Sequence, residues 1–204
     1  MPTIEFWLWR HPRASAAAGR CIGRTDLRVD PRKAKRLAHR VRASARRHGL
    51  LQAVHVSPLR RCADVGRWLR RWGWRLCIDP ALIEIDFGAW EGRGWAQIGH
   101  DEVNAWQADL LHHAPGGGES LAALAARARA WADAVAIGAC RAAAAGAEDV
   151  GTRQAPMASC IVVSHGGWIN ALLQVPAAST AIRPIDAARW PAPPALAALT
   201  RWRN

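Results

Sequence analysis

The stretch IEFWLWRHP, residues 4–12, decides the fold that we expect for this chain. Five of its first six residues are apolar, which is typical of a buried strand, and a histidine follows directly after Arg10. A second apolar run, IVVSHG at residues 161–166, also ends in a histidine. Ligands of open α/β sheets bind beyond the carboxyl ends of parallel strands. If the two strands are neighbours, His11 and His165 are therefore predicted to face one crevice.

The rest of the chain alternates between predicted strands and helices. We expect strands near residues 4–9, 53–57, 75–79 and 158–163, and helices near 32–48, 59–72, 120–146 and 167–174. This alternation predicts an α/β fold of three layers, in which a mostly parallel sheet carries helices on both faces. We expect residues 1–204 to form a single domain with a helical cap insertion near 93–118. The proline-rich segment 191–194 is expected to connect to a last strand or a short helix.

The segment VHVSPLRR, residues 54–61, joins a short predicted strand to a helix. Ser57 is predicted to cap that helix and Pro58 to take its first position. Arg60 and Arg61 would then lie in the first turn, where a cation opposes the helix dipole, so an anionic ligand would explain their placement. The alternative is an ordinary solvated basic helix, because more arginines follow on the same element.

The segment LIEIDFGAWEG, residues 82–92, sets carboxylates among apolar residues and glycines. A carboxyl group in such surroundings tends toward a raised pKa, as a general acid requires. Glu84, Asp86 and Glu91 are the candidates for that role.

These motifs, with GRCIGRTDL at 19–27 and PGGGES at 115–120, resemble the histidine phosphatase superfamily, the phosphoglycerate mutase-like group. They are most similar to its α-ribazole phosphatase branch, and they occur in the family's order over nearly the whole chain. The resemblance implies a metal-independent phosphomonoesterase that acts through a phosphohistidine intermediate and needs no cofactor. It implies a small phosphorylated metabolite as substrate, with α-ribazole 5′-phosphate of cobalamin biosynthesis or a broader range of phosphomonoesters as the alternatives.

The resemblance also implies roles for five residues. His11 would be the phosphorylated nucleophile, and Glu84 would be the proton donor. Arg10 and Arg61 would clamp the phosphate, and His165 would add a further phosphate contact. These roles suit the chemistry, because phosphoryl transfer spreads charge over three oxygens that guanidinium groups can bind in pairs. A neutral histidine can attack phosphorus and carry the phosphoryl group covalently.

The chain departs from the usual family pattern directly after His11. Most members continue with Gly and then Glu or Gln, whereas this chain has Pro12 and Arg13. Proline lacks a backbone N–H, so a phosphate contact by that amide is lost. Arg13, the amides around Gly23, and Thr25 are the candidate replacements, and Arg13 fits an ordinary surface charge equally well.

Composition limits the remaining classes. Half of the 204 residues are apolar and 22% are charged, which is a globular composition without a run long enough to cross a membrane. The N-terminus shows no signal-peptide pattern, so we expect a cytoplasmic protein. Five cysteines without close pairs predict neither disulfides nor a zinc site. His112 and His113 would point apart on a helix and have no evident third partner, so we expect no metal.

The charge balance favours anionic partners. The chain has 28 basic and 16 acidic residues, a formal net charge of +12. In the densest basic run, residues 32–47, Leu37 and Val41 lie four apart, as in an amphipathic helix with a basic outer face. A solvated face is favoured over a nucleic-acid patch, because no nucleic-acid-binding signature accompanies the run. We therefore expect no nucleic-acid partner, although the field should attract anionic substrates.

Two other functional classes remain open at this stage. A phosphoglycerate mutase would use the same scaffold, although the short chain and the departure after His11 argue against it. A regulatory or nucleic-acid-binding protein without catalysis would agree with Pro12 and the high charge. The chain also has twelve tryptophans, most of them expected in the core, and Trp90 or Trp95 could stack on a heteroaromatic leaving group.

Overall fold

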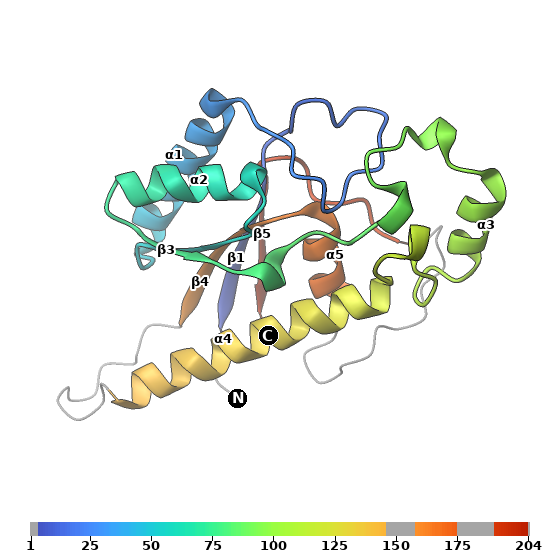
Figure 1. Ribbon diagram of the computed structural model, residues 1–204. Coiled ribbons are helices and arrows are strands. Elements are labelled where there is room, and N and C mark those ends of the chain that lie inside the picture. Colours follow the sequence, from blue (N-terminus) through green and yellow to red (C-terminus); the bar gives the residue numbers. More distant parts are fainter. Residues whose placement is uncertain (1–3, 146–157, 175–189, 204) are drawn as a thin grey trace.

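The computed structural model describes residues 4–145, 158–174 and 190–203, which form a five-stranded sheet between helices (Figure 1). The strands lie in the order β3-β2-β4-β1-β5. They comprise β1 Glu5–Arg10, β2 Ala53–Val56, β3 Arg75–Ile78, β4 Ser159–Ser164 and β5 Leu199–Arg203. Strands β1 to β4 run parallel, and β5 pairs antiparallel with β1. The predicted mostly parallel α/β sheet is thus confirmed, and the tail after residues 191–194 ends in a strand.

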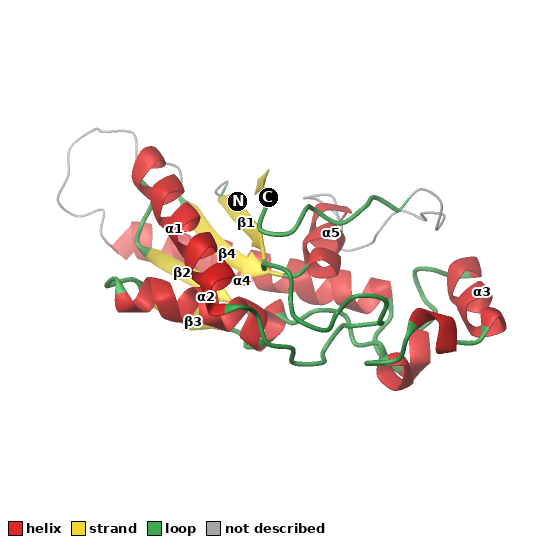
Figure 2. Ribbon diagram, turned by 90° about the horizontal axis from the view of Figure 1, so that it is seen from above, coloured by secondary structure: helices red, strands yellow, loops and turns green. Residues whose placement is uncertain are grey.

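Helices cover both faces of the sheet. α1 (Pro31–His48) and α2 (Arg60–Arg71) pack on one face, and α4 (Leu121–Ala145) and α5 (Gly166–Gln174) pack on the other (Figures 1 and 2). Strand β1 alternates between the two layers. Phe6 and Leu8 join the core beneath α4 and α5, whereas Trp7 and Trp9 join the core beneath α1 and α2. This explains why nearly every residue of β1 is apolar.

The ends of α1 follow from local chemistry. The side chain of Asp30 accepts a hydrogen bond from the Arg32 amide at 2.8 Å, and Pro31 takes the first helical position. Gly49 ends the helix with φ 64°, a left-handed conformation that glycine adopts without a Cβ clash. No helix among the described residues is long and apolar enough to cross a membrane.

The segment where we expect the cap, residues 93–118, lies beside the sheet and contains α3 (His100–Ala108), seen clearly in Figure 2. Short 3-10 turns flank α3 at Trp95–Gln97 and Pro115–Gly117, and two more lie upstream at Pro80–Leu82 and Gly88–Trp90. A Cβ atom on Gly88 would lie 2.2 Å from the carbonyl oxygen of Gly116, so the two turns touch through their backbones. The cap is therefore fixed to the segment that follows Glu84.

The predicted start of α2 is wrong by two residues. Ser57 does not cap the helix, which begins at Arg60 with Leu59 at the N-cap position. The Ser57 amide instead donates to the Val163 carbonyl at 3.2 Å, so its backbone still pairs with β4. Its hydroxyl contacts His165 and is thereby used in the site.

The helical layer over β2 and β4 should account for much of the stability. Leu37 of α1 is 1% exposed, whereas Leu51 in the following loop is 77% exposed. We expect Leu37→Ala to lower the free energy of unfolding by about 2–5 kcal/mol, because it leaves a cavity in a packed core. Leu51→Ala, the matched control, should change it by less than about 0.5 kcal/mol. Urea titration of the two variants measures both changes in the free energy of unfolding. Equal changes would contradict the place of Leu37 in a packed core.

Candidate active site

The carboxyl ends of β1 and β4 meet at the site. The two strands are parallel neighbours, with Arg10 paired to Ser164 in register. The His11 amide donates to the Ser164 carbonyl at 3.0 Å, and the ring centroids of His11 and His165 are 5.1 Å apart. The condition under which the sequence predicts a shared crevice for His11 and His165, that the two strands are neighbours, is thus met.

A cavity of about 770 Å³ opens at this edge of the sheet. Four of the five residues predicted to be catalytic line it, namely Arg10, His11, Arg61 and Glu84. Arg13, a predicted substrate-binding residue, lines it too. His165, Gly23 and Thr25 are not among the lining residues.

His11 is held as a neutral imidazole with one free nitrogen. Its Nδ1 lies 2.7 Å from the Pro12 carbonyl oxygen, which can only accept, so Nδ1 carries the proton. The lone pair of Nε2 is then available for attack. Burial, and next the charge of Arg61, lower the pKa of His11 to about 3.

Arg61 is a buried cation fixed by three acceptors. It is 2% exposed, and its Nε donates to Nδ1 of His165 at 3.0 Å. Its Nη1 donates to the Thr25 carbonyl at 2.8 Å, and its Nη2 donates to the Gly23 carbonyl. A guanidinium group has five N–H bonds, so two remain for a ligand in the cavity.

His165 is fully buried and both of its ring nitrogens are used. Nδ1 accepts from Arg61, so Nε2 carries the proton and donates to the Ser57 hydroxyl at 2.8 Å. Burial, and then the nearby charge of Arg61, keep the pKa of His165 well below its usual range. In this arrangement His165 orients Arg61, and a direct bond to phosphate would require one of the two hydrogen bonds to be exchanged.

The amides around Gly23 already bind a carboxylate from the protein itself. The backbone N–H groups of Gly23, Arg24 and Thr25 donate to Glu91 at 3.1, 2.6 and 3.0 Å, and Phe87 adds a fourth amide at 3.2 Å. Gly23 and Thr25 thus serve the site through the carbonyls that hold Arg61. Burial favours the neutral form of Glu91, but the hydrogen bonds from Thr25 and the amides outweigh it and lower the pKa.

Arg10, the residue before His11, also lines the cavity. Its Nη1 donates to the Pro194 carbonyl at 2.7 Å, in the segment that precedes β5. Its Nε is buried and has no hydrogen-bond partner among the described residues. Burial is the main cause that lowers the pKa of Arg10, and the charge of Glu84 opposes it.

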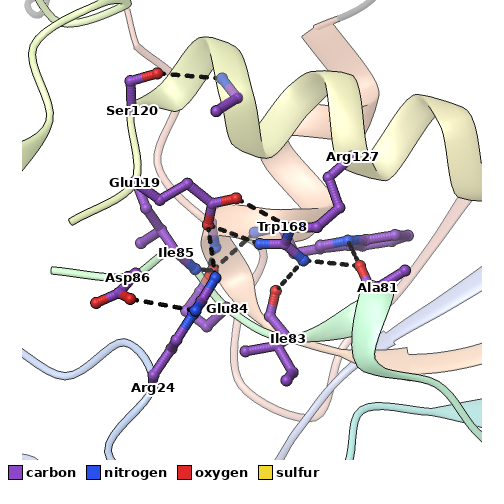
Figure 3. A network of polar contacts seen from close by, with 12 residues as sticks. Arg24, Ala81, Ile83, Glu84, Ile85, Asp86, Glu119, Ser120, Arg127 and Trp168 are labelled. Carbon is purple, nitrogen blue, oxygen red and sulfur yellow. Dashed lines mark hydrogen bonds and ion pairs between the residues drawn. The ribbon is translucent and has the colours of Figure 1, made fainter. Parts of the chain in front are cut away.

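The carboxylate of Glu84 contacts the first turn of α5, and Figure 3 shows it near Trp168 of that helix. Its carboxylate accepts from the amides of Gly167 at 3.0 Å and Trp168 at 2.9 Å, and from its neighbour Ile85 at 3.1 Å. A Cβ atom on Gly167 would lie 2.6 Å from the carboxylate, so glycine permits this approach. These bonds fix the carboxyl group of Glu84 at the start of α5 and hold it at the edge of the cavity.

The other two candidate acids have structural partners. Asp86 accepts from the Gly88 amide at 2.8 Å and pairs with Arg24 at 3.2 Å. Glu91 is enclosed by the amides described above. Of the three carboxylates weighed from the sequence, Glu84 is the one that lines the cavity.

A network that the sequence analysis did not identify supports Glu84 (Figure 3). Arg127 on α4 binds both carboxylate oxygens of Glu119, at 3.0 and 2.8 Å. Its Nη1 also donates to the carbonyls of Ala81 and Ile83 at 2.8 Å each. Arg127 therefore fixes the backbone immediately before Glu84. Glu119 lies in the PGGGES motif, but no motif or periodicity marks Arg127.

Residues 6–185 match the family described as the histidine phosphatase superfamily, branch 1. The chain belongs to this superfamily. Its members are phosphatases, and the five-stranded α/β architecture agrees with that assignment. None of the curated proteins compared with the chain matches its sequence.

Solved structures of superfamily members resemble the chain over most of its length. "Mycobacterial hydrolase 2" is 27% identical with a TM-score of 0.72, covering 98% of this chain and 82% of that one. A mycobacterial glucosyl-3-phosphoglycerate phosphatase is 28% identical with a TM-score of 0.63, covering 84% and 78%. The α-ribazole phosphatase of Shigella flexneri is 22% identical with a TM-score of 0.62, covering 83% and 78%, and this likeness shows the fold alone.

The lowered pKa of His11 can be measured directly. Because burial and the nearby arginines disfavour imidazolium, we expect the His11 ring signals to stay constant from pH 8 to pH 5 in an NMR titration. Comparison with His11→Gln assigns the signals. A titration midpoint near the ordinary value of 6.5 would contradict the neutral nucleophile.

Proposed function

We propose that this superfamily member is a metal-independent phosphomonoesterase in which Nε2 of His11 accepts the phosphoryl group. The observation that carries the proposal is the hydrogen bond from Nδ1 of His11 to the Pro12 carbonyl, which leaves Nε2 unprotonated. Arg10, Arg61 and Glu84 line the same cavity and supply the charges that the reaction requires.

The first half-reaction forms the phosphoenzyme. The lone pair of Nε2 attacks phosphorus, and the bond from phosphorus to the ester oxygen breaks. The leaving oxygen takes a proton from the carboxyl group of Glu84. Arg10 and Arg61 neutralise the charge on the equatorial oxygens, so the positive charge comes from the protein's own side chains.

The second half-reaction restores the enzyme. Glu84, now a carboxylate, takes a proton from water while the water oxygen attacks phosphorus. The bond from phosphorus to Nε2 breaks and its electron pair returns to the ring, which gives inorganic phosphate and neutral His11. The amides of Gly167 and Trp168 stabilise the carboxylate that this step needs.

The cavity has room for a large leaving group, and both polar and apolar side chains line it. Trp95 lines the cavity and is 42% exposed, whereas Trp90 is 1% exposed and belongs to a small core under the cap. Of the two tryptophans considered for stacking, Trp95 is therefore the candidate. The substrates to compare are α-ribazole 5′-phosphate, glucosyl-3-phosphoglycerate, sugar phosphates and nucleotides, and release of free phosphate rather than an isomer of 2-phosphoglycerate separates a phosphatase from a mutase.

The proposal predicts a phosphohistidine at His11. Brief reaction with ³²P-labelled para-nitrophenyl phosphate in EDTA, followed by a quench, should leave acid-labile phosphate on His11. We expect His11→Ala to lose this label and to fall by at least about a thousandfold in kcat, because it removes the nucleophile. His100→Ala, on the cap, is the matched control. Near-normal turnover by His11→Ala would overturn the mechanism.

A second prediction tests Glu84 as the proton donor. Glu84→Gln should slow the phosphorylation step with alkyl phosphates by about a hundred- to ten-thousandfold, the usual worth of general acid catalysis. Nitrophenolate leaves without help, so the same step with para-nitrophenyl phosphate should slow much less. Pre-steady-state bursts measure this step apart from hydrolysis of the phosphoenzyme. Equal slowing for both substrates would remove Glu84 from the acid role.

A further inference from the structure

Within the described residues, three further cations line the cavity beyond the pair Arg10 and Arg61. They are Arg13, Arg20 and Lys33. The proposed mechanism uses none of the three. Their presence around one cavity therefore needs a separate explanation.

A backbone bridge brings two of these cations together. Ala14, in the loop after β1, forms an isolated antiparallel bridge with Val29, just before α1. Arg13 immediately precedes one end of the bridge, and Lys33 lies in the first turn of α1 beyond the other end. Residues twenty apart in the sequence thus line one cavity.

Neither Arg13 nor Lys33 has a side-chain hydrogen bond or an ion pair with another described residue. Arg20 differs, because its Nη1 donates to the Gly92 carbonyl at 3.0 Å. A cation in the first turn of a helix opposes the helix dipole, so α1 itself does not stabilise Lys33 there. Lys35, two residues further on, instead lies over the Trp68 ring at 5.0 Å.

The charges around the cavity exceed what a single phosphate needs. Five cations and one carboxylate, Glu84, line it, and His11 is neutral. A phosphomonoester carries at most two negative charges, so the lining keeps a net positive charge when the reacting phosphate is bound. Building on the phosphatase function proposed above, we propose that Arg13 and Lys33 form a subsite for a second anionic group of the substrate. The substrate class is a phosphomonoester that also carries a carboxylate or a second phosphate.

The subsite makes a distinction among the candidate substrates. A nucleoside monophosphate such as α-ribazole 5′-phosphate has no second anionic group for the subsite, whereas a phosphorylated acid or a bisphosphate has one. Ammonium and guanidinium groups bind carboxylate and phosphate oxygens alike. The lining therefore selects a second group that is negatively charged, and it accepts either a carboxylate or a phosphate.

Matched pairs of substrates test the proposal. Glycerol 3-phosphate and 3-phosphoglycerate differ in a hydroxymethyl group against a carboxylate, and fructose 6-phosphate and fructose 1,6-bisphosphate differ in a second phosphate at longer spacing. We expect the acidic member of at least one pair to have a kcat/KM higher by about tenfold or more, the worth of a charged hydrogen bond. Which pair shows it distinguishes carboxylate from phosphate.

Matched variants then locate the effect. Lys33→Gln should lower the preference for the acidic substrate about tenfold, mainly through KM. Lys35→Gln removes the same charge two residues away and should leave the preference as it is. If both variants lower it equally, the cations act through the general field, and the subsite is overturned.

Arg13 has an alternative role, because it could bind the reacting phosphate in place of the amide that Pro12 lacks. Arg13→Gln should weaken the acidic substrate more than the neutral one if the subsite is correct. Equal weakening of both would assign Arg13 to the reacting phosphate and contradict its place in the subsite.

The wild-type enzyme separates failure of the subsite from failure of the function. Equal kcat/KM values within both substrate pairs would overturn the subsite, and the phosphatase function would stand if His11-dependent hydrolysis of para-nitrophenyl phosphate is intact. A wild-type enzyme that does not hydrolyse para-nitrophenyl phosphate would instead refute the phosphatase function.

Discussion

The buried guanidinium of Arg61 is the interaction on which the rest of the site depends. A charge that is 2% exposed is costly unless hydrogen bonds replace its water. Two carbonyls of the loop at 23–25 and one nitrogen of His165 provide those bonds. Each partner needs support of its own, which the Glu91 carboxylate gives to the loop and the Ser57 hydroxyl gives to His165. One cation on α2 thus joins the loop at 23–25 to the histidine that follows β4.

Glu84 is also held by hydrogen bonds, but here a carboxylate accepts them from backbone amides. Amides at the start of α5 bind its carboxylate, and Arg127 holds the backbone that precedes it. The Glu84 carboxylate and Arg61 are held from opposite faces of the sheet, since α5 and α2 belong to different layers. Arg24 joins the two networks, because it follows Gly23 in the loop that binds Arg61 and its side chain pairs with Glu119 at 3.7 Å. Only the carboxyl edge of the sheet, where His11 lies, is close to both. The fold thus places a carboxyl group and a buried guanidinium at one cavity while each is held by its own partners.

The sequence predicts the framework well, because strand and helix periodicity are local properties. Two histidines that end apolar runs indicate two strand ends that would share an edge if the strands are neighbours, and the structure meets this condition. The loops are harder to predict, because a run of backbone amides binds any carboxylate or phosphate that folding brings to it. The amides around Gly23 were candidates for phosphate, and Glu91, nearly seventy residues later, binds them. Ser57 was expected to cap a helix, but its hydroxyl suits a helix cap and a histidine partner equally, and the sequence does not distinguish the two. Lys33 belongs to the basic run at 32–47, and nothing in that run distinguishes it from its neighbours. It lines the cavity because the fold brings the start of α1 next to the loop after β1, where Ala14 and Val29 form a bridge.

The excess of positive charge in the cavity has an energetic consequence. Burial is the main cause of the lowered pKa values of Arg10 and His11, and repulsion from the charge of Arg61 is a smaller one that disfavours the protein without ligand. Binding of an anion relieves that repulsion and stabilises the folded state in proportion to the logarithm of its concentration over Kd. The same charges that weaken the free enzyme therefore favour the phosphate-bound one. Because the transition state spreads charge over three oxygens and the positions of the arginines are fixed beforehand, this stored electrostatic energy is available to the reaction without reorganisation of the site.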